Sequence, residues 1–190
     1  MEAKSEKKPQ VPGTYPFKVT HIGVITKDIE RTIKRYEAMG VGPFKRFRLP
    51  DARFKFKKRW MYDVDLSDSD HIVDVAYGQM SGGFGVEIYQ LINIKEPQKS
   101  IPQQYLDTKN ECVWHLGHDV ENMEEAIAWM KNAGYEVIGG SEYVDGTLMV
   151  FFGTQDLGYI IQVHEVVKGS MADQVTNAAL TKKVNSIGYL

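Results

Sequence analysis

The sequence predicts an α+β fold built from two paired βαβββ modules. Three observations lead to this prediction: one segment recurs 94 residues later, an amphipathic helix pattern follows the first strand of each copy, and similar strands close both copies. The chain has 190 residues, of which 43% are apolar and 25% charged. This composition is typical of a soluble globular protein with one domain or two small ones.

The repeat aligns HIGVITKDIERTIKRYEAMG with HLGHDVENMEEAIAWMKNAG without a gap. The identical pairs are His21 with His115, Gly23 with Gly117, Glu30 with Glu124, Ile33 with Ile127, and Gly40 with Gly134. Identity alone is modest, but both copies also share the same order of structural signals. The repeat therefore indicates a duplicated module.

Each copy begins with a short strand rich in β-branched residues, VTHIGVIT in the first and CVWHLGHDV in the second. Asp28 and Asn122 are suited to accept hydrogen bonds from the free N–H groups of a helix start. Apolar residues at helical spacing follow, and Gly40 and Gly134 suit the left-handed residue that often ends a helix.

Three further strands are expected in each copy. In the first they are RFKFKKRWMYDVDL, HIVDVAYGQM and GVEIYQLINI, and in the second YEVIGGSEY, GTLMVFFGT and GYIIQVHEVV. Glu87 and Gln162 occupy equivalent places in the closing strands. The interval from His21 to Glu87 exceeds that from His115 to Gln162, 66 residues against 47, so the first copy carries 19 extra residues between Lys45 and Tyr77.

The expected organisation has five parts. Residues 1–16 form a polar tail, 17–96 the first module, 97–111 a linker with a short helix near 103–106, 112–167 the second module, and 168–190 a C-terminal extension.

Charge and composition exclude several classes of protein. The net charge of 23 − 25 = −2 argues against a nucleic-acid binder. No apolar run approaches the roughly 18 residues of a membrane span, and the N-terminus lacks the apolar stretch of a secretory signal. The single cysteine, Cys112, allows no intramolecular disulfide. A cytoplasmic protein is the simplest expectation.

Four residues at equivalent repeat positions predict a metal site. If the modules pair about a pseudo-twofold axis, His21, His115, Glu87 and Gln162 converge and offer two imidazoles, a carboxylate and an amide oxygen. This set suits one divalent ion of Zn, Fe, Co, Ni or Mn better than calcium, which prefers oxygen ligands alone. Ligand positions left open on the ion could chelate a substrate with adjacent oxygens.

From about Phe17 to Val167 the chain resembles the vicinal oxygen chelate superfamily, the group of glyoxalases, bleomycin-resistance proteins and ring-cleaving dioxygenases. The segments THIGVITKDIERTIKRYEAMGVGPF, GVEIYQLI, WHLGHDVENMEEAI and DLGYIIQVHEV are most similar to methylmalonyl-CoA epimerases. The resemblance implies an incomplete barrel around the metal, the four ligands named above, and a homodimer. Most members have glutamate where this chain has Gln162, and glutamine cannot take up a proton at neutral pH.

By this resemblance the first expectation is an epimerase or isomerase that removes a proton next to a carbonyl group, with a methylmalonyl-CoA-like substrate. Glu87 is the candidate base. His164 lies two residues beyond Gln162 on the same strand face, and it either acts on the opposite face of the substrate or borders the pocket. His71 is expected in a loop.

The extra segment of the first copy suggests contacts to an anionic, partly apolar substrate. FKRFRLPDARFKFKKRW contains eight basic residues and one acidic residue. Strand alternation places aromatic side chains on one face and basic ones, including Arg59, on the other. The candidate substrate-binding residues are Arg53, Phe54, Lys55, Phe56 and Trp60. A strand with a buried aromatic face and a solvated basic face explains the same pattern.

Three alternative functions remain open at this stage. They are a glyoxalase I-type lyase acting on a hemithioacetal, an Fe(II) dioxygenase that uses His21, His115 and Glu87, and a small-molecule binding protein that keeps the fold without turnover. A glutamine at position 162 is compatible with a binding protein. It argues against the dioxygenase hypothesis, because ring-cleaving members usually carry a carboxylate there.

Overall fold

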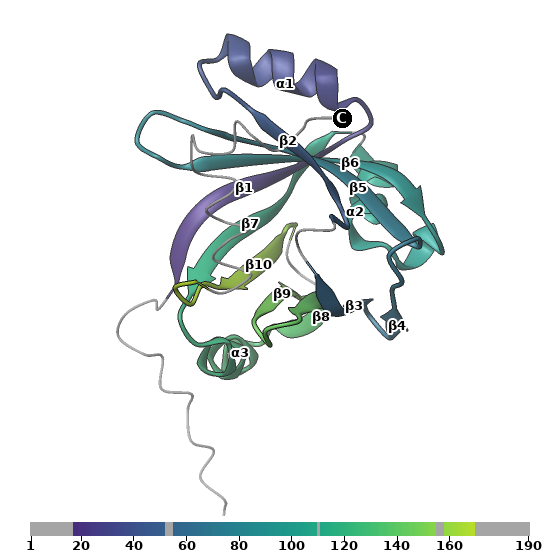
Figure 1. Cartoon of the computed structure of the whole chain (residues 1–190), viewed down its shortest axis with the longest axis vertical. Coiled ribbons are helices and arrows are strands. Elements are labelled where there is room, and N and C mark those ends of the chain that lie inside the picture. Colours follow the sequence, from purple (N-terminus) through teal and green to yellow (C-terminus); the bar gives the residue numbers. More distant parts are fainter. Residues whose placement is uncertain (1–16, 52–54, 110, 155–157, 170–190) are drawn as a thin grey trace, which may run out of the picture.

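A computed structural model describes residues 17–51, 55–109, 111–154 and 158–169 of the chain. In these residues ten strands form one mixed sheet that curls into a half-barrel, accompanied by three α-helices (Figure 1). This confirms the α+β class. The predicted tail 1–16 and all but the first two residues of the predicted extension lie outside the described residues.

The two modules have the predicted βαβββ order. The first contains β1 (Lys18–Thr26), α1 (Ile29–Ala38), β2 (Lys45–Leu49), β5 (His71–Gln79) and β6 (Gly85–Ile94). The second contains β7 (Cys112–Val120), α3 (Met123–Asn132), β8 (Glu136–Tyr143), β9 (Leu148–Gly153) and β10 (Ile160–Glu165). A 3-10 helix (Pro97–Lys99) and α2 (Ile101–Lys109) connect them, so the linker helix is longer than the expected 103–106.

Side-chain caps start both module helices as predicted. The Asp28 carboxylate accepts a hydrogen bond from Arg31 N at 3.0 Å, and the Asn122 side chain accepts one from Glu125 N at 3.2 Å. Gly40 and Gly134 follow the helices with φ of 84° and 88°, a region that glycine enters without a Cβ clash. These local signals fix where each helix lies between its strands.

The central strands of the sheet join the two modules. The strand order is β2-β5-β6-β1-β7-β10-β9-β8-β3-β4. β1 and β7 pair antiparallel, and each also pairs in parallel with the closing strand of its own module, β6 or β10. Helices α1 and α3 lie on the outside of the curved sheet (Figure 1). The closing strands therefore flank the first strands, and the polar residues of all four strands meet at one centre.

The extra segment of the first copy was placed wrongly by sequence reasoning. The second strand of the first module is β2, and the segment after it forms β3 (Phe56–Met61) and β4 (Val64–Asp65). β3 pairs with β8, at the edge of the second module, so an insertion from one module extends the sheet of the other. Sequence periodicity within the insertion carries no information about this non-local partner.

One arginine links the two ends of the curled sheet. Arg59 on β3 donates from Nη2 to the backbone oxygen of His71 on β5, at 2.9 Å. His71 is the first residue of β5 and is buried, so the expectation that it lies in a loop is wrong. Arg59 is also buried, contrary to the expected solvated basic face. A bulge between Phe56 and Lys58 breaks the alternation on which that expectation rested.

The inner face of the half-barrel is apolar around its polar centre. Its buried residues come from both modules and from α2, and they include Ile25, Val73, Val75, Tyr89, Ile101, Trp114 and Phe151. Separate clusters pack α1 and α3 against the outer face. None of the helices in the described parts of the chain combines the length and apolar character of a membrane span.

Candidate metal centre

Two glycines create the space in which the central histidines lie. In the β1–β7 pair, His21 lies opposite Gly117 and Gly23 lies opposite His115. A Cβ on Gly117 would stand 1.9 Å from His21 Cε1, and a Cβ on Gly23 would stand 1.9 Å from His115 Cε1. Each imidazole therefore rests on the bare backbone of the other module. The repeated H-x-G pattern has this steric cause.

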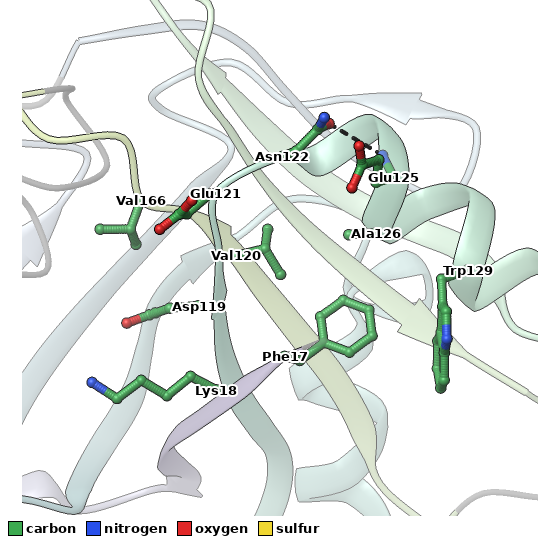
Figure 2. Close-up of a pocket in the computed structure, with 10 residues that line it drawn as sticks. All are labelled: Phe17, Lys18, Asp119, Val120, Glu121, Asn122, Glu125, Ala126, Trp129 and Val166. Carbon is green, nitrogen blue, oxygen red and sulfur yellow. Dashed lines mark hydrogen bonds between the residues drawn. The ribbon is translucent and has the colours of Figure 1, made fainter. Parts of the chain in front are cut away.

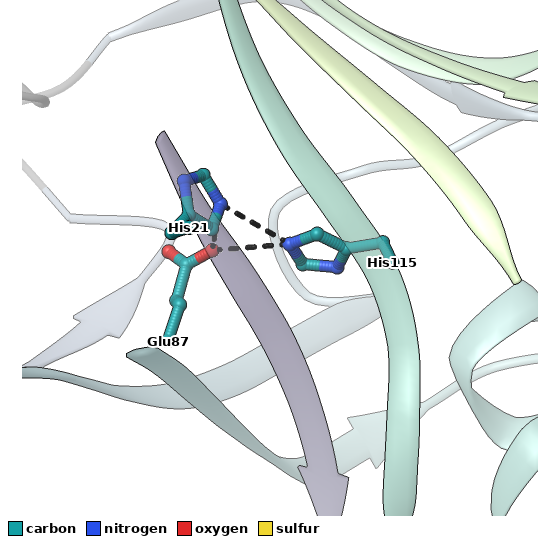
Figure 3. Close-up of side chains that lie close together, drawn as sticks. All are labelled: His21, Glu87 and His115. Atoms are coloured by element: carbon teal, nitrogen blue, oxygen red, sulfur yellow. Dashed lines mark hydrogen bonds and ion pairs between the residues drawn. The ribbon is translucent and has the colours of Figure 1, made fainter. Parts of the chain in front are cut away.

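The closing strands bring the remaining polar groups to the same point. Glu87 on β6 pairs with Gly23, and Gln162 on β10 pairs with Gly117. His21 Nε2 lies 3.2 Å from Glu87 Oε2, 3.2 Å from His115 Nε2 and 3.0 Å from Gln162 Oε1. His115 Nε2 lies 3.5 Å from Glu87 Oε2. All four residues are buried, and Figure 3 shows the two imidazoles and the carboxylate facing one another.

A hydroxyl group fixes the tautomer of one histidine. Thr20 Oγ1 donates to Gly117 O at 3.2 Å and lies 3.0 Å from His21 Nδ1. Because its proton is given to Gly117 O, this hydroxyl accepts from the N–H at Nδ1. The Nε2 lone pair of His21 then faces the centre, which is the form that binds a metal.

The resulting cluster needs a positive charge. The His21 lone pair meets an amide oxygen and a carboxylate oxygen, which is unfavourable unless a cation or a further proton lies between them. Two donor atoms each about 2.1 Å from one ion are about 3.0 Å apart at right angles and about 3.4 Å apart in a tetrahedron. The observed separations of 3.0–3.5 Å match that range, so these residues fit one divalent ion.

Electrostatics in the cluster agree with this reading. Burial alone would raise the pKa of Glu87, but hydrogen bonds and charge interactions with His115 and His21 hold it well below its usual value. Burial opposes protonation of His21, yet the Glu87 carboxylate raises its pKa above 6.5. Burial lowers the pKa of His115 to about 4, so this imidazole keeps a lone pair. The cluster therefore holds an ionised carboxylate, a His115 imidazole with a free lone pair, and a His21 imidazole that favours a positive charge, which a divalent ion would supply in place of the proton.

A cavity of about 440 Å³ opens onto the cluster. It is lined by His21 and Glu87 together with Lys18, Thr20, Phe47, Tyr77, Gln79, Phe84, Asp119 and His164 among others. His164 lies with its ring centroid 5.9 Å from that of His21, and burial lowers its pKa to about 3. Its imidazole is therefore neutral at the rim of the cavity. We call this space the mouth cavity.

The three candidate substrate residues that the structure describes in the insertion, Lys55, Phe56 and Trp60, lie elsewhere. Lys55 is exposed, while Phe56 and Trp60 line a second, smaller cavity that shares no lining residue with the mouth cavity. Arg53 and Phe54 lie outside the described residues. The structure thus separates Phe56 and Trp60 from the entrance to the candidate metal centre.

A larger hollow shares Lys18 and Asp119 with the mouth cavity but is lined by none of the four clustered residues. It lies beside α3 and is lined by Phe17, Lys18, Asp119, Val120, Glu121, Asn122, Glu125, Ala126, Trp129 and Val166 (Figure 2). The dashed bond in Figure 2 is the Asn122 cap of α3, so part of its polar lining already serves the helix.

Two residues of the centre were missed by sequence reasoning. The Tyr89 ring lies beside His115, with ring centroids 5.7 Å apart, and burial raises the pKa of its hydroxyl well above the usual value. Its position two residues after Glu87 on the same strand face was a usable signal. Thr20 could not be found in this way, because its partner Gly117 belongs to the other module.

Known proteins share this fold. The sequence model of the glyoxalase/bleomycin resistance protein/dioxygenase superfamily matches residues 20–151. The methylmalonyl-CoA epimerase from Mycobacterium tuberculosis is 14% identical, with 82% of this chain and 93% of that chain covered and a TM-score of 0.51. A hypothetical protein from Bacillus halodurans C-125 is 18% identical, with 79% and 94% covered and a TM-score of 0.49. No curated protein sequence matches the chain.

Proposed function

This chain belongs to the glyoxalase/bleomycin resistance protein/dioxygenase superfamily, and we propose that it is a metal-dependent epimerase or isomerase. It removes a proton next to a carbonyl group of a substrate with vicinal oxygens, such as methylmalonyl-CoA. The convergence of His21, Glu87, His115 and Gln162 beneath the mouth cavity carries this proposal. One divalent ion of Zn, Co, Ni, Mn or Fe completes the site.

The four residues would hold the ion from the floor of the mouth cavity. A bound divalent ion supplies Lewis-acid stabilisation of the negative charge that develops on the substrate oxygens. Aromatic rings pack around His115 on one side of the centre: Trp114, Tyr89 and Phe151 lie with ring centroids 4.4, 5.7 and 6.3 Å from that of His115. These contacts hold the His115 imidazole in place.

Two side chains at the mouth cavity are placed to move the proton. Glu87 is ionised and borders the cavity, so it is the proposed base. His164 is neutral and lies near the His21 ring, and we assign it the delivery or return of the proton on the other face of the substrate. Gln162 stays a ligand, because an amide does not take up a proton at neutral pH.

The proposal also concerns the substrate contacts, the oligomeric state of the protein and its location in the cell. Substrate contacts through Arg53, Phe54, Lys55, Phe56 and Trp60 stay a prediction from the sequence, because Phe56 and Trp60 line a cavity separate from the mouth cavity. We also propose a homodimer that acts in the cytoplasm, which size-exclusion chromatography and cell fractionation test.

The experiment has two stages. Metal content is measured by mass spectrometry on protein purified without chelator or affinity metal, beside His21→Ala and His115→Ala. The exchange of the α-proton of methylmalonyl-CoA with deuterium from solvent is then followed by NMR for the native protein, Glu87→Gln and His164→Phe. Glu136→Gln, a change at an exposed glutamate of β8, is the matched control.

We expect about one ion per chain in the native protein and loss of the ion in both histidine variants. Exchange should fall at least about a hundredfold in Glu87→Gln, the size of a lost general base, and remain unchanged in Glu136→Gln. A bound metal without α-proton exchange would contradict the proposal. In that case, exchange that appears only in Gln162→Glu would mark the native chain as a binding protein.

A further inference from the structure

The second cavity adjoins the metal centre at His115. It measures about 70 Å³ and is lined by residues of both modules, including Trp114, Tyr89 and Phe151, whose rings surround the His115 imidazole. This volume holds a group of a few non-hydrogen atoms. We call it the inner cavity. Arg59, His71 and Trp60 also line it, and Arg59 and Trp60 come from the insertion that crosses to the second module.

Within the described parts of the chain, three buried donor groups of this lining have no hydrogen-bond partner. They are Arg59 Nη1, His71 Nε2 and Trp114 Nε1. Arg59 Nη2 lies 3.3 Å from His71 Nδ1 and carries only donor hydrogens, so Nδ1 accepts and the imidazole proton is on Nε2. An unpaired buried donor is costly, and three of them around one cavity call for an acceptor ligand.

The charge around the cavity is positive. Arg59 has only 8% of its surface exposed and keeps its guanidinium charge inside the barrel. Its nearest carboxylate, Asp68 Oδ1, is 3.7 Å from Nη1 and belongs to a side chain that is 76% exposed. Among the described residues that line the inner cavity there is no aspartate or glutamate. A buried arginine with so weak a partner favours an anion beside it.

We propose that the inner cavity is an anion subsite that binds a small carboxylate through Arg59, His71 and Trp114. The planar guanidinium matches a carboxylate, and the neutral imidazole and the indole each add one N–H donor. The apolar remainder of the lining, such as Met61, Val73 and Phe151, accommodates the one or two carbons that carry the carboxylate.

The position of this subsite also defines a substrate class, and this part rests on the proposed function. A substrate held at the metal centre would extend a short carboxylate-bearing arm past His115 into the inner cavity. Any larger part of the bound substrate, such as a coenzyme thioester, would extend out through the mouth cavity of about 440 Å³. Substrates that carry, besides the vicinal oxygens, a further free carboxylate a few carbons from the reacting carbon are therefore preferred over methylmalonyl-CoA itself and over their own esters and amides.

Binding of propionate to metal-free protein tests the subsite without the proposed reaction. Isothermal titration calorimetry gives the affinity, and tryptophan fluorescence reports on the cavity because Trp60 and Trp114 line it. Propionamide, which has the same shape without the charge, is the ligand control. The variants are Arg59→Met and His71→Phe, and Lys57→Met is the matched control on the exposed face of the same strand.

Propionate should bind at least about tenfold more tightly than propionamide, and both inner-cavity variants should lose about tenfold in affinity. Lys57→Met and metal-free His21→Ala should bind as the native protein does. If Arg59→Met does not fold, His71→Phe alone decides, since it keeps the arginine and removes one donor. Absence of propionate binding, or equal binding by the folded inner-cavity variants, would overturn the subsite. Propionate binding in a protein that exchanges no α-proton would leave the subsite standing and refute only the proposed reaction.

Discussion

Replacing Gly117 with alanine should displace the His21 imidazole and weaken the metal centre. The new Cβ would lie 1.9 Å from Cε1 and 2.2 Å from Nε2 of His21, where ordinary contacts are no shorter than 3.4 Å. The ring must therefore move by about 1.5 Å, and a ligand set tolerates much smaller errors. Gly23→Ala should have the same effect on His115, since its Cβ would lie 1.9 Å from that ring.

The expected loss of metal affinity is about a hundredfold or more, which corresponds to about 2.7 kcal/mol. Overpacking should also lower the free energy of unfolding by about 1–3 kcal/mol. Competition titration against a chromophoric chelator measures the affinity, and urea unfolding measures the stability. Gly158→Ala is the matched control, because a Cβ at that position meets no atom within 4 Å. Native metal affinity in either central variant would refute the steric argument.

Two further predictions concern the residues around the centre. Thr20→Val should lower metal affinity by about 10- to 100-fold in the same titration, because the hydroxyl that orients His21 is lost. Thr108→Val, a change at an exposed threonine, is the control. A loss in Thr20→Val no larger than in this control would count against the orienting role. Burial and the charge of Arg59 lower the pKa of His71 to about 3, so the folded protein favours the neutral imidazole. The contribution of this imidazole to the free energy of unfolding is therefore present above pH 6.5 and is lost as the pH falls toward 3. Urea unfolding should show the native protein losing about 2 kcal/mol more than His71→Phe between pH 7 and pH 5, and equal losses would contradict the assignment.

The pairing of the modules explains why the site is built from a repeat. A strand pair related by a pseudo-twofold axis places equivalent residues on either side of that axis, so one histidine and one closing-strand polar side chain per module become four donor groups at one point. The same relation requires a small residue opposite each histidine, which Gly23 and Gly117 supply. The spacing of histidine and glycine in the gap-free repeat is therefore required by the site as well as by the fold.

The two modules differ in the residue that precedes each central histidine. Thr20 precedes His21 and holds its Nδ1, whereas Trp114 precedes His115 and packs against its ring with centroids 4.4 Å apart. The first module thus supports its histidine by a hydrogen bond and the second by an aromatic contact. This difference places the polar mouth cavity beside His21 and the aromatic inner cavity beside His115.

The sequence by itself determined the features that depend on local pattern and on the internal repeat. Strand and helix periodicity, the caps Asp28 and Asn122, and the terminal glycines act within a few residues, so the βαβββ order could be read directly. The duplicated H-x-G motif and the matching closing strands identified the residues that converge at the centre, because equivalent positions meet when two copies pair.

Only the tertiary structure decided what depends on contacts between distant strands. The residues of the insertion predict a strand but not the module with which it pairs. Its pairing with β8 depends on contacts between distant residues, which the local sequence pattern does not predict. A single bulge after Phe56 reversed the expected faces and buried Arg59 against His71. The inner cavity exists because these residues, separated in the chain, close the two ends of one curled sheet around Trp114.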